Sequence, residues 1–370
     1  MKFTCSQLTL TRALNTVSKA VSNKTTIPVL RGILIQAKDN KLTLTASDLD
    51  ISIIREMPAE IEEEGSAVVP SKLFGDIVRK LPNEEIVIED TAAGSLNMST
   101  SSSDFSVVTM PVDQFPKIGD SIEDKAVVRI EANMFREMIR KTSFAASMEE
   151  AKGTLVGILT ELTPDTIEMV ALDGFRLAHT SKEMINEESR SFIVAAKIMN
   201  ELSKITSDEI EAATVRISLG DKSAVVNVGS TEIILRIMEG EFIRYRDIIP
   251  KDSQIKVVIS RSLLLESIER ASLLAKEGKN NLIKFSIRDS MITITSRSEE
   301  GNVKEEIGID KEGDDLDIGF NSKYVIDVLK AIDDEEIMMN FKNSISPCVI
   351  SPVEGREFEY LVLPVRIPNI

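Results

Sequence analysis

Tryptophan is absent from this chain of 370 residues, and cysteine and histidine are scarce. The two cysteines, Cys5 and Cys348, are too few for a disulfide framework or a cysteine-based metal site, so we expect reduced thiols. His179 is the single histidine, and we interpret it as a surface or half-buried residue of a strand rather than a catalytic base. A glycine-rich phosphate loop is missing as well. We therefore predict a binding protein that is not an enzyme and needs no cofactor or metal.

Long apolar runs are also lacking. No stretch of about 18 apolar residues occurs, which argues against a membrane-spanning helix. The first residues show no signal-peptide pattern. We therefore expect a cytoplasmic protein that does not contact a membrane.

Charge is plentiful but unevenly distributed. The formal net charge is −16, which by itself disfavours a nucleic-acid partner. Six candidate helices, however, contain fifteen Lys or Arg and only six Asp or Glu. They are expected at 7–20, 71–80, 133–141, 195–205, 261–276 and 322–331. Such segregation favours one basic surface on an acidic body, as expected for a protein that binds a polyanion.

One short pattern occurs three times at nearly constant spacing. Lys72, Lys197 and Lys323 are 125 and 126 residues apart. An acid follows each lysine by four residues and a base follows by seven. Positions i and i+7 share a helix face, so each unit predicts a helix with a basic stripe. A period this long indicates a duplicated domain rather than a solenoid repeat.

The rest of each repeat has a common order. A strand leads into a first helix, with Ser6 and Ser260 at the expected N-caps of two of them. Alternating strands form hairpins, of which Asp39-Asn40 predicts a tight turn. Helix and strand content then predicts an α+β fold of antiparallel sheets with two helices per domain. The domains are expected at 1–120, 121–250 and 251–370.

Four segments resemble one known family along the whole chain. They are Met1-Lys2-Phe3-Thr4, Asp173-Gly174-Phe175-Arg176-Leu177-Ala178, the helix that begins Phe320-Asn321-Ser322-Lys323-Tyr324, and Pro364-Val365-Arg366. In this order they are similar to the bacterial DNA polymerase III β subunits, the sliding clamps. The resemblance implies three repeated clamp domains and a head-to-tail homodimer whose six domains form a ring around double-stranded DNA. It also implies a processivity factor that tethers the replicative DNA polymerase, the clamp loader and repair proteins through short peptide motifs. The alternative is a protein-interaction scaffold that does not encircle DNA.

By its repeat positions, the resemblance implies a set of basic DNA contacts that neutralise phosphates without reading bases. The expected DNA-binding residues are Arg12, Lys19, Lys24, Lys72, Arg79, Lys80, Arg136, Arg140, Lys141, Lys197, Lys204, Arg270, Lys323 and Lys330.

The resemblance further implies a peptide-binding groove between the second and third domains. We expect an aliphatic trough rimmed by Arg176 and Arg366, with Leu177, Ile248 and Leu363 as its floor. Plain core packing is the alternative interpretation of these apolar residues. The groove positions are Leu155, Leu172, Gly174, Phe175, Arg176, Leu177, Ile243, Ile248, Asn321, Tyr324, Ile345, Pro347, Leu361, Leu363, Pro364, Val365 and Arg366. Ile243 replaces the family's common proline, and Pro368-Asn369-Ile370 extends past its usual end.

The dimer is expected to form between the first domain of one chain and the third domain of its partner. Leu273 and Leu274 match interface positions of the family, and Phe105 lies on a predicted edge strand where a partner strand can pair.

Overall fold

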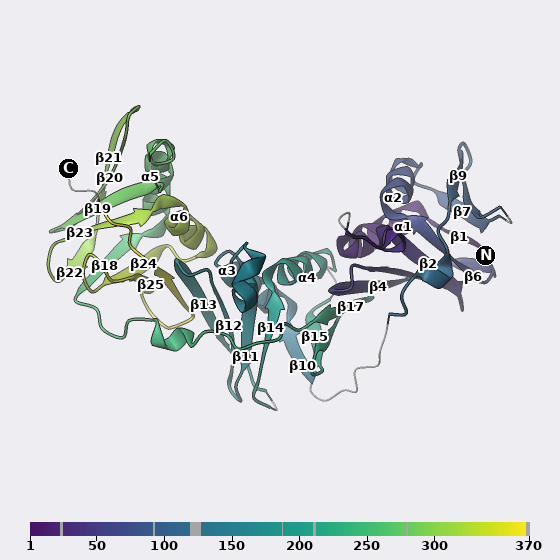
Figure 1. The fold of residues 1–370 in the computed structure, drawn as a ribbon, viewed down its shortest axis with the longest axis horizontal. Coiled ribbons are helices and arrows are strands. Elements are labelled where there is room, and N and C mark those ends of the chain that lie inside the picture. The colour runs from purple at the N-terminus through teal and green to yellow at the C-terminus, as the bar shows by residue number, and fades with distance from the viewer. Residues whose placement is uncertain are drawn as a thin grey trace. The chain divides into compact units, whose positions relative to one another are not determined.

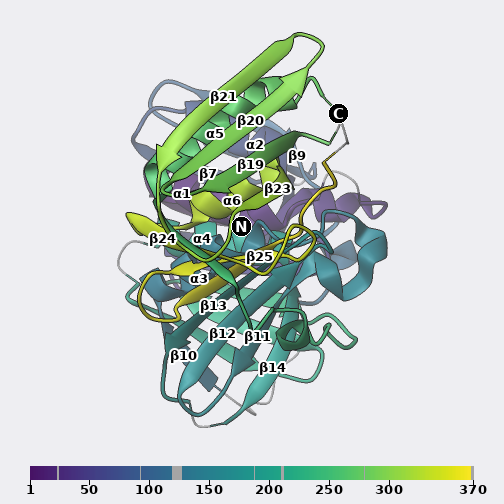
Figure 2. The ribbon, with the colours of Figure 1, turned by 90° about the vertical axis from the view of Figure 1, so that its left-hand side faces the viewer.

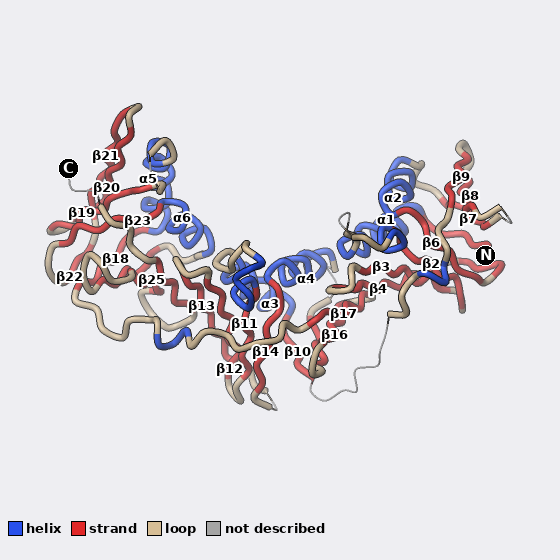
Figure 3. Tube along the Cα trace, in the orientation of Figure 1, coloured by secondary structure: helices blue, strands red, loops and turns tan. Residues whose placement is uncertain are grey.

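The computed structural model describes residues 1–22, 25–91, 93–118, 127–186, 188–209, 212–278 and 280–367. Lys24 and the extension 368–370 lie outside the described residues. Spatial contacts group the chain into two compact units. Unit 1 contains Met1–Phe135 and Glu201–Ile237, and unit 2 contains Arg136–Asn200 and Met238–Ile370. Figure 3 shows that both combine helices with many strands.

Unit 1 contains two antiparallel sheets. A five-stranded sheet has the order β5-β1-β7-β8-β9, and an eight-stranded sheet has the order β10-β15-β16-β17-β4-β3-β2-β6. Their strands are β1 Lys2–Ser6, β2 Gly32–Lys38, β3 Lys41–Ser47, β4 Ile51–Pro58, β5 Glu60–Glu63, β6 Gly65–Pro70, β7 Glu85–Asp90, β8 Ser95–Ser99, β9 Asp104–Val108, β10 Val127–Glu131, β15 Thr214–Leu219, β16 Ser223–Val228 and β17 Thr231–Arg236.

Unit 2 has the corresponding arrangement. Its nine-stranded sheet has the order β14-β11-β12-β13-β26-β25-β24-β18-β22, and its four-stranded sheet has the order β21-β20-β19-β23. Their strands are β11 Gly157–Leu162, β12 Thr166–Leu172, β13 Arg176–Glu183, β14 Arg190–Ala195, β18 Ile255–Ser260, β19 Leu282–Arg288, β20 Met291–Ser298, β21 Gly301–Gly308, β22 Asp310–Glu312, β23 Leu316–Asn321, β24 Glu336–Phe341, β25 Cys348–Pro352 and β26 Phe358–Val362. Figure 2 shows the four-stranded sheet, against whose strands β20 and β21 helix α5 packs.

All six expected helices are present within two or three residues of their predicted bounds. Within unit 1, α1 packs beside α2, and within unit 2, α5 packs beside α6 (Figure 1). The boundaries of the two units fall inside α3 and α4. The α-helices are α1 Gln7–Val17, α2 Ser71–Lys80, α3 Ala132–Ser143, α4 Ala196–Asp208, α5 Arg261–Ala275 and α6 Ser322–Ala331. Shorter 3₁₀ turns are η1 Ser18–Ala20, η2 Pro28–Arg31, η3 Val112–Gln114, η4 Glu150–Val156 and η5 Tyr245–Asp247.

The predicted hairpin turn and the predicted N-cap positions of two helices are both confirmed. Asp39 and Asn40 both have positive φ, 50° and 56°, as a two-residue hairpin turn of this kind requires. Ser6 and Ser260 occupy N-cap positions, but neither side chain makes a capping hydrogen bond. Asn321 does cap α6, because its side-chain oxygen accepts from the Lys323 amide at 3.0 Å. The carboxylate of Glu131 does the same at the start of α3.

Strands from different repeats join in continuous sheets. The third hairpin strand of the first repeat, β4, pairs with the last strand of the second, β17, with Ile53 opposite Ile233. In the same way β13 pairs with β26, with Ala178 opposite Tyr360. Because these strand pairs cross the boundaries between repeats, the two units defined by spatial contacts do not coincide with the three repeats. The three-domain division at 1–120, 121–250 and 251–370 therefore stays a prediction about the duplicated unit.

The helices bury one face and expose the other. In α2, Phe74 and Val78 are fully buried whereas Lys72 is exposed. In α6, Val325 and Val328 are buried and Lys323 is exposed. Burying such side chains is worth about 1.5–3 kcal/mol each, which fixes the helix orientation on the sheet. None of the described helices has the length and apolar character needed to cross a membrane.

Candidate nucleic-acid and peptide interfaces

The first base of each repeated stripe is free. Lys72 on α2, Lys197 on α4 and Lys323 on α6 are all exposed. Among the described residues, none of these three ammonium groups has an ion-pair partner. Each is therefore free to neutralise an external anion without first breaking an internal contact.

The last base of each stripe is instead paired. Arg79 contacts Asp76, Lys204 lies 2.8 Å from Glu201, and Lys330 lies 2.7 Å from Glu269 of α5. These pairs are exposed and contribute little to stability. A DNA phosphate can replace the carboxylate, but the internal ion pair is then lost, so these bases contribute less to the free energy of DNA binding than an unpaired base does.

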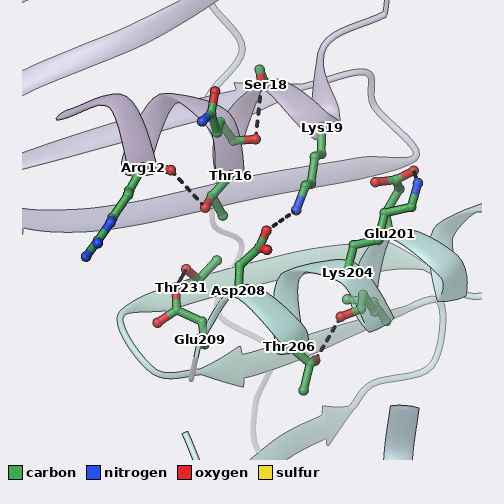
Figure 4. A network of polar contacts seen from close by, with 12 residues as sticks. Arg12, Thr16, Ser18, Lys19, Glu201, Lys204, Thr206, Asp208, Glu209 and Thr231 are labelled. Carbon is green, nitrogen blue, oxygen red and sulfur yellow. Dashed lines mark hydrogen bonds and ion pairs between the residues drawn. The ribbon is translucent and has the colours of Figure 1, made fainter. Parts of the chain in front are cut away.

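Lys19 on η1 has an ion-pair partner, whereas Arg12 on α1 has none shown in Figure 4. Lys19 Nζ lies 2.5 Å from Asp208 at the end of α4. The exposed guanidinium of Arg12 points away from this network. Arg55 on β4 contacts Glu209 nearby and reaches Thr231 at 2.8 Å. Lys19 thus has a structural partner within unit 1, which the sequence pattern did not reveal.

One of the predicted DNA contacts in unit 2, Lys141, has a buried side chain with an internal partner. Lys141 is buried, with 5% of its side chain exposed, and its ammonium group lies 2.6 Å from Glu137. It also lies over the Phe358 ring, so it has no free path to a phosphate. Arg140 is exposed, donates to the Ala331 carbonyl oxygen at 3.0 Å and contacts Asp333.

The remaining basic positions are accessible to different degrees. Arg270 on α5 is exposed and pairs with Glu305 at 2.6 Å, which raises the pKa of its guanidinium. Lys80 is exposed and Arg136 is half-buried. Lys24 lies outside the described residues.

Five of the predicted groove positions belong to one apolar cluster in unit 2 or pack against it. Leu172, Leu177 and Leu361 are each less than 5% exposed and belong to its core. Leu155 and Leu363 are partly buried and pack against them. The side chains of these three core leucines are already covered within unit 2, which agrees with the alternative of plain core packing.

More accessible apolar side chains lie next to the cluster in the chain. Ile243 is 43% exposed and Ile248 is 40% exposed, and Tyr245 between them belongs to the core of the cluster. Ile345 is 83% exposed and precedes β25, which pairs with β26. Ile248 is therefore a surface residue rather than part of a buried floor.

Arg176 is not a rim residue. Its side chain is 9% exposed, and its guanidinium lies 3.2 Å from Asp173 and 2.5 Å from Asp327 of α6. It also donates to the Phe144 carbonyl oxygen at 2.6 Å and stacks on the rings of Phe144 and Tyr324. With these contacts Arg176 is a buried structural hub, whereas Arg366 is exposed as predicted for the rim.

The turn before β13 presents an aromatic side chain to solvent. Gly174 has φ +97°, a region that favours glycine. Asp173 accepts hydrogen bonds from the amides of Phe175 and Arg176 at 2.8 and 3.0 Å. Phe175 is 53% exposed and stacks on Tyr324, with ring centroids 5.9 Å apart.

The last described segment is held by backbone hydrogen bonds to the turn before β13 and to strand β23. The Leu363 amide donates to the Phe175 carbonyl oxygen, and the Val365 amide donates to that of Gly319. A β-carbon at Gly319 would lie 2.7 Å from the Val365 carbonyl oxygen, so glycine is needed for this approach. Pro347 and Pro364 are half-buried, and the side chain of Asn321 caps α6.

Sequence reasoning missed a polar cluster in unit 2. The Tyr245 hydroxyl lies 2.7 Å from a Glu161 oxygen and 3.0 Å from a Glu168 oxygen and donates its one proton to either carboxylate. Arg246 contacts the same two carboxylates. His179 is half-buried on β13, as expected, and hydrogen-bonds Glu168 at 3.0 Å. This contact and its neighbours hold the pKa of Glu168 at about 2, and burial raises the pKa of Tyr245. No local pattern signals this cluster, because Tyr245 and its partners Glu161 and Glu168 are 84 and 77 residues apart in the sequence.

The three predicted dimer residues lie on exposed or edge elements of their own units. Phe105 is 42% exposed on β9, the end strand of the five-stranded sheet. Leu273 on α5 is 67% exposed, and Leu274 is half-buried.

Comparison with known proteins identifies the family. Three models of the DNA polymerase III beta subunit match in order: the N-terminal domain at residues 1–119, the central domain at 129–243 and the C-terminal domain at 246–366. The chain belongs to the DNA polymerase III beta subunit family. Its function is that of a DNA sliding clamp and not of an enzyme.

Individual relatives cover the whole chain. A beta sliding clamp of Staphylococcus epidermidis is 34% identical over 99% of both chains. A solved DNA polymerase sliding clamp from Bacillus subtilis is 32% identical, covers 100% of both chains and gives a TM-score of 0.94. A Pseudomonas aeruginosa sliding clamp bound to griselimycin is 27% identical, covers 99% of this chain and 100% of its own, and gives a TM-score of 0.93.

Proposed function

We propose that two copies of this chain close head to tail into a ring around double-stranded DNA. The pattern of strand pairing carries the proposal. In the first two repeats the third hairpin strand pairs with the last strand of the following repeat, as β4 does with β17 and β13 with β26. The third repeat offers β21 and the first repeat offers β9, and both are end strands of their sheets. A partner chain supplies the missing strand for each.

The ladder register predicts which residues meet. Ile53 is opposite Ile233, and Ala178 is opposite Tyr360. In the strand registers of the third repeat, Val303 on β21 corresponds to Ile53 and Ala178. In those of the first repeat, Phe105 on β9 corresponds to Ile233 and Tyr360. Phe105 of one chain then lies opposite Val303 of its partner. Pairing also removes two exposed edges, which would otherwise favour uncontrolled association.

Paired cysteines test this closure. Residues directly opposite in an antiparallel ladder have α-carbons about 4.5–5.5 Å apart, within reach of a disulfide. A chain carrying Phe105→Cys and Val303→Cys is expected to oxidise to a covalently closed dimer on a non-reducing gel. Cys5 and Cys348 are buried and do not interfere. Phe105→Cys with Lys304→Cys is the matched control, because adjacent strand residues face opposite sides. Equal cross-linking in both pairs would contradict the register.

We further propose that the exposed bases of the six helices face the enclosed DNA and contact only phosphates. The free ammonium groups of Lys72, Lys197 and Lys323 support this role. Contacts that ignore base identity let a ring move along the duplex. The net charge of −16 disfavours DNA on the rest of the surface.

The partners of the ring are proposed to bind at the apolar cluster of unit 2. The replicative polymerase, the clamp loader and repair proteins would each insert apolar side chains of a short motif beside Phe175, Ile248 and Leu363, with Arg366 at the rim. The support is the exposed apolar set beside a rigid core, because such patches mark interaction sites. A labelled peptide from the C-terminus of the replicative polymerase should bind in fluorescence polarisation. Leu363→Asp should abolish its binding, whereas Leu49→Asp, at an exposed leucine of unit 1, should not. Unchanged binding to the Leu363 variant would exclude this site.

A further inference from the structure

The segment 242–249, here called the strap, has a buried residue, Tyr245, at its centre, exposed residues on both sides of it and partly buried residues at its two ends. Tyr245 is 3% exposed, and Phe242 and Ile249 are partly buried against the apolar cluster. Ile243 and Ile248 are about two-fifths exposed. Two short backbone contacts, Tyr245 amide to Ile243 oxygen and Ile248 amide to Tyr245 oxygen, are the only ones between these three residues in the described chain. These two hydrogen bonds tie the backbone of both isoleucines to that of Tyr245.

Polar contacts fasten the strap to the sheet. The Tyr245 hydroxyl lies 2.7 Å from a Glu161 oxygen and 3.0 Å from a Glu168 oxygen. The Arg246 guanidinium lies 2.8 and 2.7 Å from the same two carboxylates and 4.6 Å over the Tyr245 ring. Hydrogen bonds to charged groups are stronger than neutral ones.

The sheet presents a matching acidic surface. Glu161 on β11 is directly opposite Glu168 on β12, and like charges in that position repel. His179 on β13 contacts Glu168 at 3.0 Å, and its other ring nitrogen lies 3.8 Å from Glu359 of β26. The strap thus supplies the cation and the hydroxyl that neutralise and satisfy the carboxylate pair. Packing of the Tyr245 ring on the apolar cluster does not by itself require the carboxylates of Glu161 and Glu168.

We propose that Tyr245 and Arg246, held by Glu161 and Glu168, are positioning residues that set the place of Ile243 and Ile248 and so determine which apolar side chains a partner peptide can insert. The inference rests on the proposed peptide site beside the apolar cluster. If the peptide binds only when the strap is docked on the sheet, the apparent affinity is the intrinsic affinity multiplied by the fraction of molecules in which the strap is docked.

Removal of one hydroxyl tests the proposal. Tyr245→Phe keeps the ring in the apolar cluster and removes its hydrogen bonds to the carboxylates. We expect the affinity for the fluorescein-labelled C-terminal peptide of the replicative polymerase to fall about threefold to tenfold. Amide hydrogen exchange within 243–249 should quicken, and peptides with Leu, Ile, Phe or Ala at the apolar anchors should differ less in affinity. Unchanged affinity and exchange would overturn the proposal.

Tyr360→Phe is the matched control. Tyr360 lies on the same sheet, and its buried hydroxyl has no hydrogen-bond partner among the described residues. Its removal is expected to leave peptide affinity and strap exchange unchanged. An equal loss in both variants would mean that any tyrosine change in this sheet disturbs the site, and would also contradict a specific role for Tyr245.

A charge exchange separates positioning from packing. Arg246→Glu should weaken peptide binding, because three carboxylates then meet, and adding Glu161→Arg should restore most of the affinity. A double variant as weak as Arg246→Glu alone would contradict the ion-pair role. If Leu363→Asp binds the peptide as wild type does, the proposed peptide site fails. If that variant loses binding while Tyr245→Phe does not, only the positioning role fails.

Discussion

The guanidinium of Arg176, on β13, lies 2.5 Å from the carboxylate of Asp327, on α6. Asp327 is the acid of the third basic stripe, and its partner is therefore not the nearby Lys330. Arg176 joins the sheet that carries the apolar cluster to a helix that carries two exposed lysines. Both elements belong to unit 2.

Arg176→Met should be strongly destabilising. It leaves the half-buried carboxylates of Asp173 and Asp327 without their shared cation, and breaking a buried pair costs about 3–5 kcal/mol. Urea unfolding should show the loss, whereas Arg366→Met, at an exposed arginine, should leave the midpoint unchanged. Equal stability of the two variants would show that Arg176 is not a structural hub.

Neutralising Lys72, Lys197 and Lys323 together should weaken DNA retention and lower its salt dependence. Each lost phosphate contact reduces the slope of log affinity against log salt by about 0.9, so a ring with three fewer contacts per chain shows a marked decrease. The matched triple change at Arg79, Lys204 and Lys330 should have a smaller effect, because those bases already pair internally. A wild-type slope in the first triple variant would mean that these lysines do not face DNA.

Leu273→Asp should convert the dimer to a folded monomer. Leu273 is 67% exposed within one chain, so the change does not disturb the core. A buried unpaired carboxylate at an interface is costly. Sedimentation equilibrium measures the outcome, and the stronger Leu273→Asp, Leu274→Asp pair provides a second variant. A dimer of unchanged affinity in both would exclude α5 from the interface.

Acid stability should depend on Glu168. Its folded pKa of about 2 lies below the ordinary value of 4.5, chiefly because His179 donates a hydrogen bond to it. A depressed carboxyl pKa contributes stability that is fully present above pH 4.5 and is lost as pH falls towards 2. At about 1.4 kcal/mol per pH unit, the contribution reaches a few kcal/mol. Glu168→Gln should flatten the fall in unfolding free energy between pH 4.5 and 2, and an unchanged slope would contradict the assignment.

The helices and hairpins were predictable because their signals are local. The spacing of Lys72 and Arg79, and the Asp39-Asn40 turn, depend on residues close in sequence, and the structure has both elements. The outcome for long basic side chains depends on distant partners. Lys141 pairs with Glu137 one helical turn away, which is a local signal, but the Phe358 ring beneath it comes from a distant strand. Arg176 is covered by residues of three different segments, which no local pattern encodes.

The strand pairing between repeats was also beyond local reasoning. Nothing in the sequence of β4 or β13 specifies pairing with β17 or β26 across the repeat boundaries. Only the ladders show that the third hairpin strand of one repeat continues into the last strand of the next. From that regularity we expect the end strand β9 of one chain to pair with the end strand β21 of its partner in the dimer.

Retention on DNA circles tests ring closure around the duplex most directly. The protein is loaded onto a nicked circular plasmid by the clamp loader of the same cell and separated from free protein on a sizing column at moderate salt. We predict that loaded protein stays with the circle and is lost once a single-cutting nuclease linearises it, because a ring slides off a free end. Equal retention on circular and linear DNA, or equal loss from both, would contradict it.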